Sequence, residues 1–160
     1  MIVYLIRHGQ AEDLSESGHD ADRVLVHKGH EQAAAIAEFL SDPAQSSPTI
    51  VLASPYTRTT QTATPIWNAL GQPVQHEPRI AADRFAEDIM SVIEESDAPS
   101  LALVSHNPLI GRAADILVAG PSAPRLHSMR PGQLYGFKVD RENPIGSAQL
   151  VAKFRMDDAF

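Results

Sequence analysis

The sequence predicts an α/β fold, a three-layer α/β/α sandwich with a mostly parallel central sheet and a C-terminal antiparallel edge hairpin. Three observations support this prediction. Short apolar runs typical of buried strands alternate with segments of helical periodicity. The early runs are apolar throughout, which suits strands that are covered on both faces. The chain then closes with two strand-like segments joined by a polar turn, which is typical of a hairpin with one solvated side.

Composition limits the classes of protein to which the chain can belong. Its 160 residues predict a single domain over 1–160, large enough for a real core. A formal net charge of −7 argues against nucleic acid or an anionic membrane as partner, and we expect a monomer. The absence of cysteine excludes disulfides, thiolate catalysis and cysteine-ligated metal. Neither a signal-peptide pattern nor a membrane-spanning run occurs, so we expect a cytoplasmic protein.

Three strands and two helices are expected in the first half of the chain. Residues 2–6 and 49–53 are short apolar runs, which predicts strands. Residues 29–40 and 56–70 carry apolar side chains on one face at helical spacing. Pro65 lacks a backbone N–H, so we expect a kink or an early end of the second helix there. The half also holds a long surface loop over 10–28 and a short edge strand over 74–76.

The second half is expected to add two helices and three strands. A third helix is marked by apolar residues at helical spacing, namely Phe85, Ile89, Val92 and Ile93. Residues 100–104 form another buried strand, and Asn107-Pro108 has the pattern of an N-cap and first turn for a helix over 109–118. A loop over 119–132 then leads into the two hairpin strands, residues 134–139 and 148–156.

Basic and imidazole side chains follow three of the predicted strands. Arg7-His8-Gly9 ends the first, Arg58 follows the second within four residues of Ser54-Pro55, and His106 follows the third. The carboxyl ends of parallel strands meet at one edge of a sheet, where ligands bind. Gly9 can adopt backbone angles closed to other residues, so a turn there would present its neighbours to one space. Guanidinium groups and helix N-termini bind phosphoryl groups, and an imidazole can act as a nucleophile, so the sequence predicts a phosphate site.

Each of these residues also has a structural interpretation when taken alone. Arg7 could be a solvated charge at a strand end, and Arg58 could decorate the first turns of a helix. His8 could be a structural histidine, and His106 could be a loop residue beside the Asn107 cap. Together these interpretations leave unexplained why histidine and arginine recur at strand ends. We expect the loops around the site to set its specificity.

Other kinds of site have weaker support in the sequence. Neither Gly-x-x-x-x-Gly-Lys nor Gly-x-Gly-x-x-Gly occurs, which argues against the common nucleotide-binding loops. Ser54 and Ser105 lie at strand ends but lack the Gly-x-Ser-x-Gly elbow of many serine hydrolases. His27 and His30 could share a helical face as metal ligands, but no carboxylate motif accompanies them. We therefore expect no metal and no cofactor.

Three stretches in this order resemble the histidine phosphatase superfamily, the phosphoglycerate-mutase-like proteins. They are Arg7-His8-Gly9, the run Ser-Pro-Tyr-Thr-Arg58-Thr-Thr-Gln-Thr-Ala, and the run Val-Ser-His106-Asn-Pro-Leu-Ile-Gly. The short chain, together with the segment Asp20-Ala-Asp-Arg23-Val-Leu, is most similar to the small SixA-type phosphohistidine phosphatases. The resemblance extends from the first strand to the helix after His106.

The resemblance implies a role for each matched residue. His8 would attack phosphorus and become phosphohistidine, and water would then hydrolyse this covalent intermediate. Arg7 and Arg58 would hold the phosphoryl oxygens, with His106 as a further donor. Arg23 matches a position that reaches toward the phosphate or the substrate. Positive neighbours also disfavour protonation of His8, which must be neutral to attack.

One departure from the family pattern bears on the substrate. Relatives that act on alcohol phosphates commonly carry an acid after the third short strand, whereas residues 79–82 contain none and Asp83 follows directly. A weak general acid matters less when an imidazole leaves, so we expect a phosphohistidine-bearing protein as substrate and inorganic phosphate as product. The alternatives are a phosphatase of small phosphate esters with Asp83 as general acid and, more remotely, a phosphate-binding domain without turnover.

Overall fold

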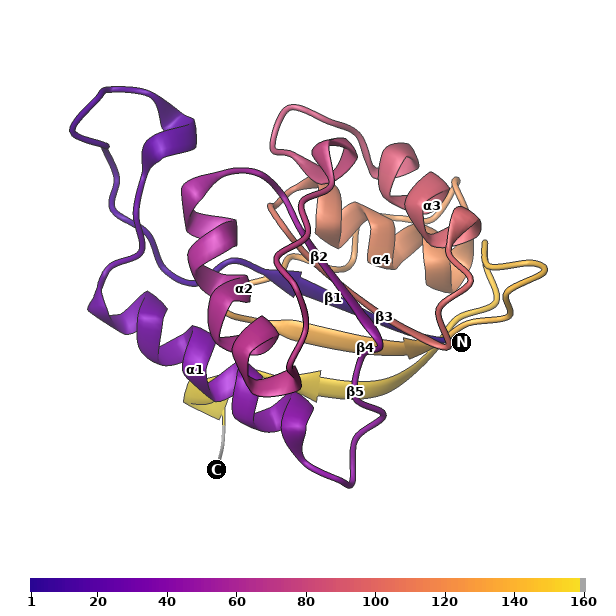
Figure 1. Ribbon diagram of the computed structural model, residues 1–160. Coiled ribbons are helices and arrows are strands. Elements are labelled where there is room, and N and C mark those ends of the chain that lie inside the picture. The colour runs from indigo at the N-terminus through magenta and orange to yellow at the C-terminus, as the bar shows by residue number, and fades with distance from the viewer. Residues whose placement is uncertain (159–160) are drawn as a thin grey trace.

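Five strands form one sheet in the order β2-β3-β1-β4-β5 in the computed structural model, which describes residues 1–158 (Figure 1). The strands are β1 (Ile2–Arg7), β2 (Ile50–Ala53), β3 (Ser100–Ser105), β4 (Leu134–Lys138) and β5 (Gln149–Phe154). The helices are α1 (His27–Ser41), α2 (Thr57–Leu70), α3 (Ala86–Glu95) and α4 (Leu109–Ala119), with short 3-10 turns η1 (Asp20–Asp22), η2 (Pro78–Ile80) and η3 (Met156–Asp158). Among residues 1–158, no helix is both long and apolar enough to cross a membrane.

The sheet is mixed, so the predicted α/β class is confirmed but its mostly parallel character is wrong in part. β1 pairs parallel with β3, and β3 pairs parallel with β2, whereas β4 is antiparallel to both β1 and β5. The segment 120–133 returns the chain from the end of α4 to the carboxyl edge of the sheet, where the N–H of Gly132 donates to the carbonyl of His8. β4 therefore starts where β1 ends and must run against it.

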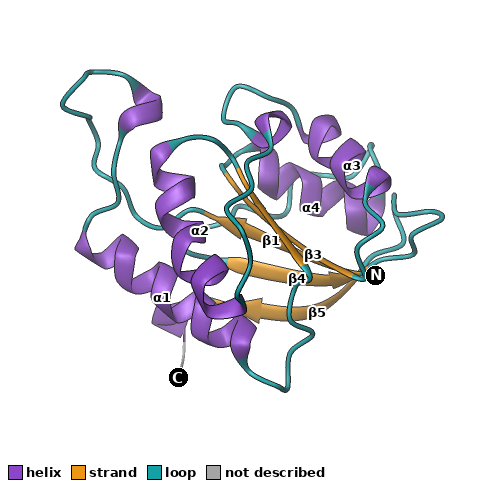
Figure 2. Cartoon of the chain, in the orientation of Figure 1, coloured by secondary structure: helices purple, strands orange, loops and turns teal. Residues whose placement is uncertain are grey.

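Two pairs of helices cover the two faces of the sheet (Figure 2). Val3 and Leu5 of β1 belong to the hydrophobic core shared with α3 and α4, whereas Tyr4 and Ile6 belong to the core shared with α1 and α2. Successive strand residues point to opposite faces, which explains why an unbroken apolar run was needed here. This double burial fixes β1 in the middle of the sheet and presents the residues after Arg7 at its carboxyl edge.

The early end of the helix at Pro65 and the strand over 74–76 are both corrected. α2 continues through Pro65 to Leu70, because the burial of Ile66 and Trp67 against the sheet outweighs the cost of one missing helical hydrogen bond. Residues 74–76 form no strand of their own, and only His76 makes an isolated parallel bridge to Ala53.

Two expectations about helix starts are also corrected. Phe85 lies at the N-cap of α3 with 72% of its surface exposed, so the first residue of the apolar pattern is outside the core. Asn107 does not cap α4, whose N-cap is Pro108. The Asn107 amide donates instead to the carbonyl of Met129 at 2.6 Å, so a tertiary contact replaces the local cap.

Candidate active site

The carboxyl ends of β1, β2 and β3 bring His8, Arg58 and His106 together. His8 follows β1, Arg58 lies in the first turn of α2 just after β2, and His106 follows β3. Nε of Arg58 donates to Nε2 of His8 over 3.3 Å, and the two imidazole rings lie edge to face with centroids 5.4 Å apart. All three side chains are buried, so they lie away from bulk water.

The hydrogen bonds of His8 select one tautomer of its ring. Nδ1 lies 2.7 Å from the carbonyl oxygen of Gly9, which can only accept, so Nδ1 carries the proton. Nε2 is then the nitrogen with the free lone pair, consistent with its accepting from Arg58. Burial, together with the positive charges of Arg58 and Arg7, lowers the pKa of His8 to about 4, against the opposing effect of the Gly9 hydrogen bond. His8 is therefore a neutral imidazole at pH 7, and burial contributes more to this than the arginines that the sequence suggested.

His106 is held by Ser54, for which the sequence suggested only a role as a nucleophile. Nε2 of His106 lies 2.8 Å from the hydroxyl of Ser54, a fully buried residue that follows β2 directly. Nδ1 of His106 is buried and has no hydrogen-bond partner among the described residues. The ring of Tyr56 packs edge to face against His106, with centroids 4.8 Å apart. Burial first, and then the neighbouring His8 and Arg58, lower the pKa of His106 to about 3.

Arg7 is oriented from the loop that precedes β4. Nη1 of Arg7 donates to the carbonyl of Met129 over 2.8 Å, and the amide of Asn107 donates to the same oxygen. Nε of Arg7 is buried without a partner in the described part of the chain. Burial and the charge of Arg58 lower the pKa of Arg7 below its ordinary value. The loop over 119–132 thus borders the site through a backbone carbonyl, which sequence spacing does not reveal.

Arg23 joins the site indirectly, through Asp20 in the loop over 10–28. The Asp20 carboxylate lies 2.9 Å from Nη1 of Arg23 and 3.0 Å from Nη2 of Arg58. The backbone carbonyl of Asp20 also accepts from Nη1 of Arg58 over 2.7 Å. Hydrogen bonds from Arg23 and Arg58 lower the pKa of the Asp20 carboxyl. Asp20 therefore occupies guanidinium donors that an incoming phosphoryl group would use.

Asp83 lies at the surface and does not contact His8. It is exposed in the turn after η2 and makes no hydrogen bond or ion pair with any residue in 1–158. Its negative charge adds to burial in raising the pKa of Tyr56, the ring that packs on His106. The Asp83 carboxylate is thus an exposed charge on the Tyr56 side of His106.

Gly9 is required for close approach, not for the unusual backbone angles that the sequence suggested. Its φ is not among the positive values found at other glycines. A Cβ at Gly9 would lie 2.6 Å from the carbonyl oxygen of Gly29 in α1, and a Cβ at Gly29 would lie 2.1 Å from that of Gln10. The two glycines let the segment after His8 run directly against the start of α1.

The arrangement combines a neutral nucleophile with a cluster of fixed positive charges. Arg7 and Arg58 surround the ring of His8, and His106 offers a second imidazole beside it. Such a set can bind a tetrahedral oxyanion, stabilise charge on its oxygens and form a bond from Nε2 to its central atom. His27 lies elsewhere, 3.0 Å from Glu31, and the described residues hold no cluster of three metal-ligating side chains.

Comparisons with known proteins agree with this arrangement. Residues 3–81 match the family model of the histidine phosphatase superfamily (branch 1), a range that includes His8 and Arg58. A search of curated proteins found no match to the chain.

Solved structures of phosphatases share the fold. The protein histidine phosphatase SixA, solved in complex with tungstate, superposes with a TM-score of 0.81 at 21% identity, covering 97% of each chain. A protein described as a phosphohistidine phosphatase SixA from Agrobacterium tumefaciens gives 0.78 at 24% identity over 96% of each chain. The α-ribazole phosphatase from Shigella flexneri gives 0.71 at 19% identity over 95% of each chain. At such low sequence identities, the similarity to these solved structures shows a shared fold and nothing more.

Proposed function

We propose that this chain, which belongs to the histidine phosphatase superfamily, is a phosphatase that removes the phosphoryl group from phosphohistidine on a protein through a covalent intermediate on His8. One observation carries the proposal. Nδ1 of His8 is tied to the Gly9 carbonyl, and the unprotonated Nε2 faces Arg58. A nucleophilic lone pair is thus aimed at the place where guanidinium groups would hold a phosphoryl group.

In the first step, the lone pair on Nε2 of His8 forms a bond to phosphorus while the bond from phosphorus to the leaving nitrogen breaks. The leaving imidazole keeps the electron pair of that bond and becomes neutral by taking a proton from solvent on a ring nitrogen. The positive charge that develops on His8 is stabilised by the hydrogen bond from Nδ1 to Gly9. Arg7, Arg58 and His106 would hold the phosphoryl oxygens as charge redistributes.

In the second step, water attacks phosphorus and the bond to Nε2 of His8 breaks. Nε2 regains its lone pair, inorganic phosphate leaves, and the proton lost by water remains on the phosphate or in solvent. His8 returns to the neutral state that its lowered pKa favours. The arginines provide the positive charge, and the two steps need no redox partner.

The position of Asp83 supports phosphohistidine as the substrate. An exposed carboxylate that makes no contact with the buried His8 is badly placed to give a proton to an alkoxide leaving group beside it. An imidazole leaving group needs less help, because solvent can protonate it on the far ring nitrogen. The fold shared with the protein histidine phosphatase SixA supports the same choice.

A phosphoenzyme experiment tests the mechanism. Brief incubation with radiolabelled phosphoramidate, followed by rapid alkaline quenching, should leave label that is stable in alkali and lost in acid, as expected for phosphohistidine. His8→Ala should carry no label, whereas His127→Ala, which changes a histidine that binds Asp115 outside the site, should label like the wild type. Label that persists in His8→Ala would refute the covalent role of His8.

A second candidate function is hydrolysis of small phosphate esters with Asp83 as general acid. It is favoured by the proximity of Asp83 to Tyr56 and by the fold shared with an α-ribazole phosphatase. The two functions are separated by comparing kcat/KM on a phosphohistidine peptide with kcat/KM on a panel of sugar and nucleotide phosphates. Asp83→Asn should leave peptide turnover within about twofold, and a large loss confined to esters would favour the second function.

A further inference from the structure

Two arginines without an internal partner line the same groove beside the active site. The sequence contains ten arginines, and within residues 1–158 only Arg84 and Arg125 make neither a side-chain hydrogen bond nor an ion pair. Both border a hollow that we call the arginine groove, formed by Arg84, Phe85, Pro108, Leu109, Arg112 and Arg125. Unpaired guanidinium groups in a chain of net charge −7 leave donors available for an external anion.

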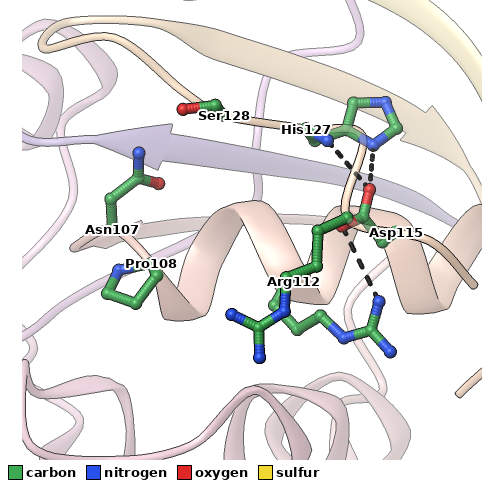
Figure 3. Close-up of a pocket in the computed structure, with 7 residues that line it drawn as sticks. Asn107, Pro108, Arg112, Asp115, His127 and Ser128 are labelled. Atoms are coloured by element: carbon green, nitrogen blue, oxygen red, sulfur yellow. Dashed lines mark hydrogen bonds and ion pairs between the residues drawn. The ribbon is translucent and has the colours of Figure 1, made fainter.

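The wall of the groove at Arg112 is fixed by internal contacts, which Figure 3 shows in a close-up of a neighbouring hollow that shares Arg112. Arg112 donates to the carbonyls of Pro121 and Ala123 and lies 3.8 Å from the carboxylate of Asp115. Asp115 is buried and accepts from the ring and the backbone N–H of His127. Arg112, Asp115 and His127 are thus paired with one another and hold the wall in place. The Asp115 carboxylate does not neutralise Arg125.

The groove lies beside the active site. Pro108 lies two residues after His106, and the opposite wall begins at Ala82, next to Asp83. A second hollow that shares Pro108, Arg112 and Arg125 extends it toward Asn107, whose amide binds the same carbonyl as Arg7. A chain segment seated in the groove would therefore lead to the phosphate-binding residues.

The chemistry of the groove selects its occupant. Arg84 and Arg125, whose charges have no internal partner, outnumber Glu87, the acidic residue on the rim, so the local charge is opposite to that of the whole chain. Phe85 adds an aromatic ring that is 72% exposed. We propose that the arginine groove binds an acidic segment, carrying at least one large apolar side chain, of the phosphorylated protein whose phosphohistidine enters the active site. This inference rests on the proposed function and names the surface on which its protein substrate docks.

Matched peptides test the groove. Two phosphohistidine peptides should be compared, one with Asp, Glu and Leu around the phosphohistidine and one with Asn, Gln and Leu in their place. The wild type should show a kcat/KM about tenfold higher for the acidic peptide, mainly through KM, and this preference should shrink as ionic strength rises. Turnover of phosphoramidate, which is too small to reach the groove, serves as the internal reference.

Charge-reversal variants test whether the groove arginines cause the preference for the acidic peptide. Arg84→Glu and Arg125→Glu should each reduce kcat/KM on the acidic peptide several-fold, and the double variant should abolish the preference while phosphoramidate turnover stays within about twofold. Lys138→Glu is the matched control, because it makes the same charge change on an exposed side chain at the end of β4 remote from the site. Equal kcat/KM for both peptides in the wild type would overturn the proposal.

A binding measurement separates this inference from the proposed function. The acidic peptide without phosphate should bind the wild type in an NMR titration and shift the resonances of Arg84, Phe85 and Arg125, and the double variant should not bind it. If the protein turns over no substrate but still binds this peptide, the proposed phosphatase function is refuted, whereas the proposal that the groove binds an acidic segment is retained. If a single-stranded oligothymidylate binds the groove more tightly than the peptide, the protein-docking proposal is wrong.

Discussion

The hydroxyl of Ser54 lies 2.8 Å from Nε2 of His106, and both residues are buried. The same hydroxyl oxygen accepts from the backbone N–H of Tyr56 at 3.4 Å, so its own proton is available for His106. A neutral His106 that accepts at Nε2 carries its proton on Nδ1. Nδ1 is the ring nitrogen that has no partner among the described residues, so a phosphoryl oxygen could satisfy it.

Ser54→Ala should remove this control of the His106 tautomer. Without the hydroxyl, both tautomers become populated, and part of the protein presents a lone pair where the phosphoryl oxygen needs a donor. We expect the Kd for tungstate and the kcat/KM for phosphoramidate to worsen about tenfold, the size of one hydrogen bond to a charged group. Long-range ¹H–¹⁵N NMR should report one tautomer in the wild type and a mixture in the variant.

Ser105→Ala is the matched control for this prediction. Ser105 is also fully buried and ends the neighbouring strand, but its hydroxyl donates to the carbonyl of Ile80 and not to an imidazole. The Ser105→Ala variant should lose some stability and keep the same His106 tautomer as the wild type. Identical ¹⁵N spectra for Ser54→Ala and the wild type would remove Ser54 from the mechanism.

Asp20→Asn should strengthen the binding of oxyanions. The carboxylate bridges Arg23 and Arg58 at hydrogen-bond distance, so it competes with phosphate for their donors and repels it. Asn keeps an oxygen acceptor for the arginines but removes the charge. We expect a Kd for tungstate that is several-fold lower, with a greater inhibition by inorganic phosphate.

Asp22→Asn is the control for Asp20→Asn. Asp22 lies in the same 3-10 turn and accepts from Ser17, and within residues 1–158 it contacts no arginine. It should leave oxyanion binding unchanged, because the charge that it removes is not between the guanidinium groups. Weaker binding in Asp20→Asn would mean that Asp20 serves to position Arg58.

The parts of the site that the sequence predicted are those set by strand periodicity. An apolar run that ends in Arg7-His8 places these side chains at the end of a buried strand, and the same logic applies to His106 after β3. Parallel pairing of β1, β2 and β3 then gathers their carboxyl ends at one edge. Local patterns are sufficient to predict this part of the site, because few sheet topologies are available to such strands.

The parts that the sequence did not predict depend on contacts between distant loops. The Met129 carbonyl that binds Arg7 is 122 residues away in the chain, and a backbone oxygen has no signature of its own. Phe85 has the spacing of a core residue, but spacing does not tell which turn of a helix still faces the sheet. The direction of β4 relative to β1 has no local signature, because it depends on where the preceding loop returns the chain.

Gly29→Ala should destabilise the protein although alanine favours helices. A Cβ at Gly29 would lie 2.1 Å from the carbonyl oxygen of Gln10, so the backbone after His8 must move. We expect the free energy of unfolding to fall by about 3 kcal/mol in urea titrations, the upper range for overpacking. Ala34→Gly, at an exposed position of the same helix, should cost only about 1 kcal/mol from helix propensity.

The two buried imidazoles should make the protein less stable in mild acid. The pKa of His8 is about 4 and that of His106 about 3 in the folded protein, against 6.5 as the ordinary value. Below pH 6.5 the unfolded chain therefore takes up protons that the folded chain does not bind, and stability falls as the pH decreases. Each histidine should cost roughly 2 kcal/mol between pH 7.5 and pH 5, and nothing further above pH 7.5.

Urea unfolding at pH 7.5, 6 and 5 measures this effect through variants. His8→Gln and His106→Gln should each reduce the loss of unfolding free energy between pH 7.5 and pH 5 by about 2 kcal/mol relative to the wild type. His27→Gln should follow the wild type, because the His27 side chain is 92% exposed in the folded protein. Carboxylates also contribute to the loss of stability in acid, but they do so in all four proteins, so their contribution cancels in the comparison. The same pH slope in all four would show that neither imidazole is held neutral by burial, and the nucleophile would then need another source of activation.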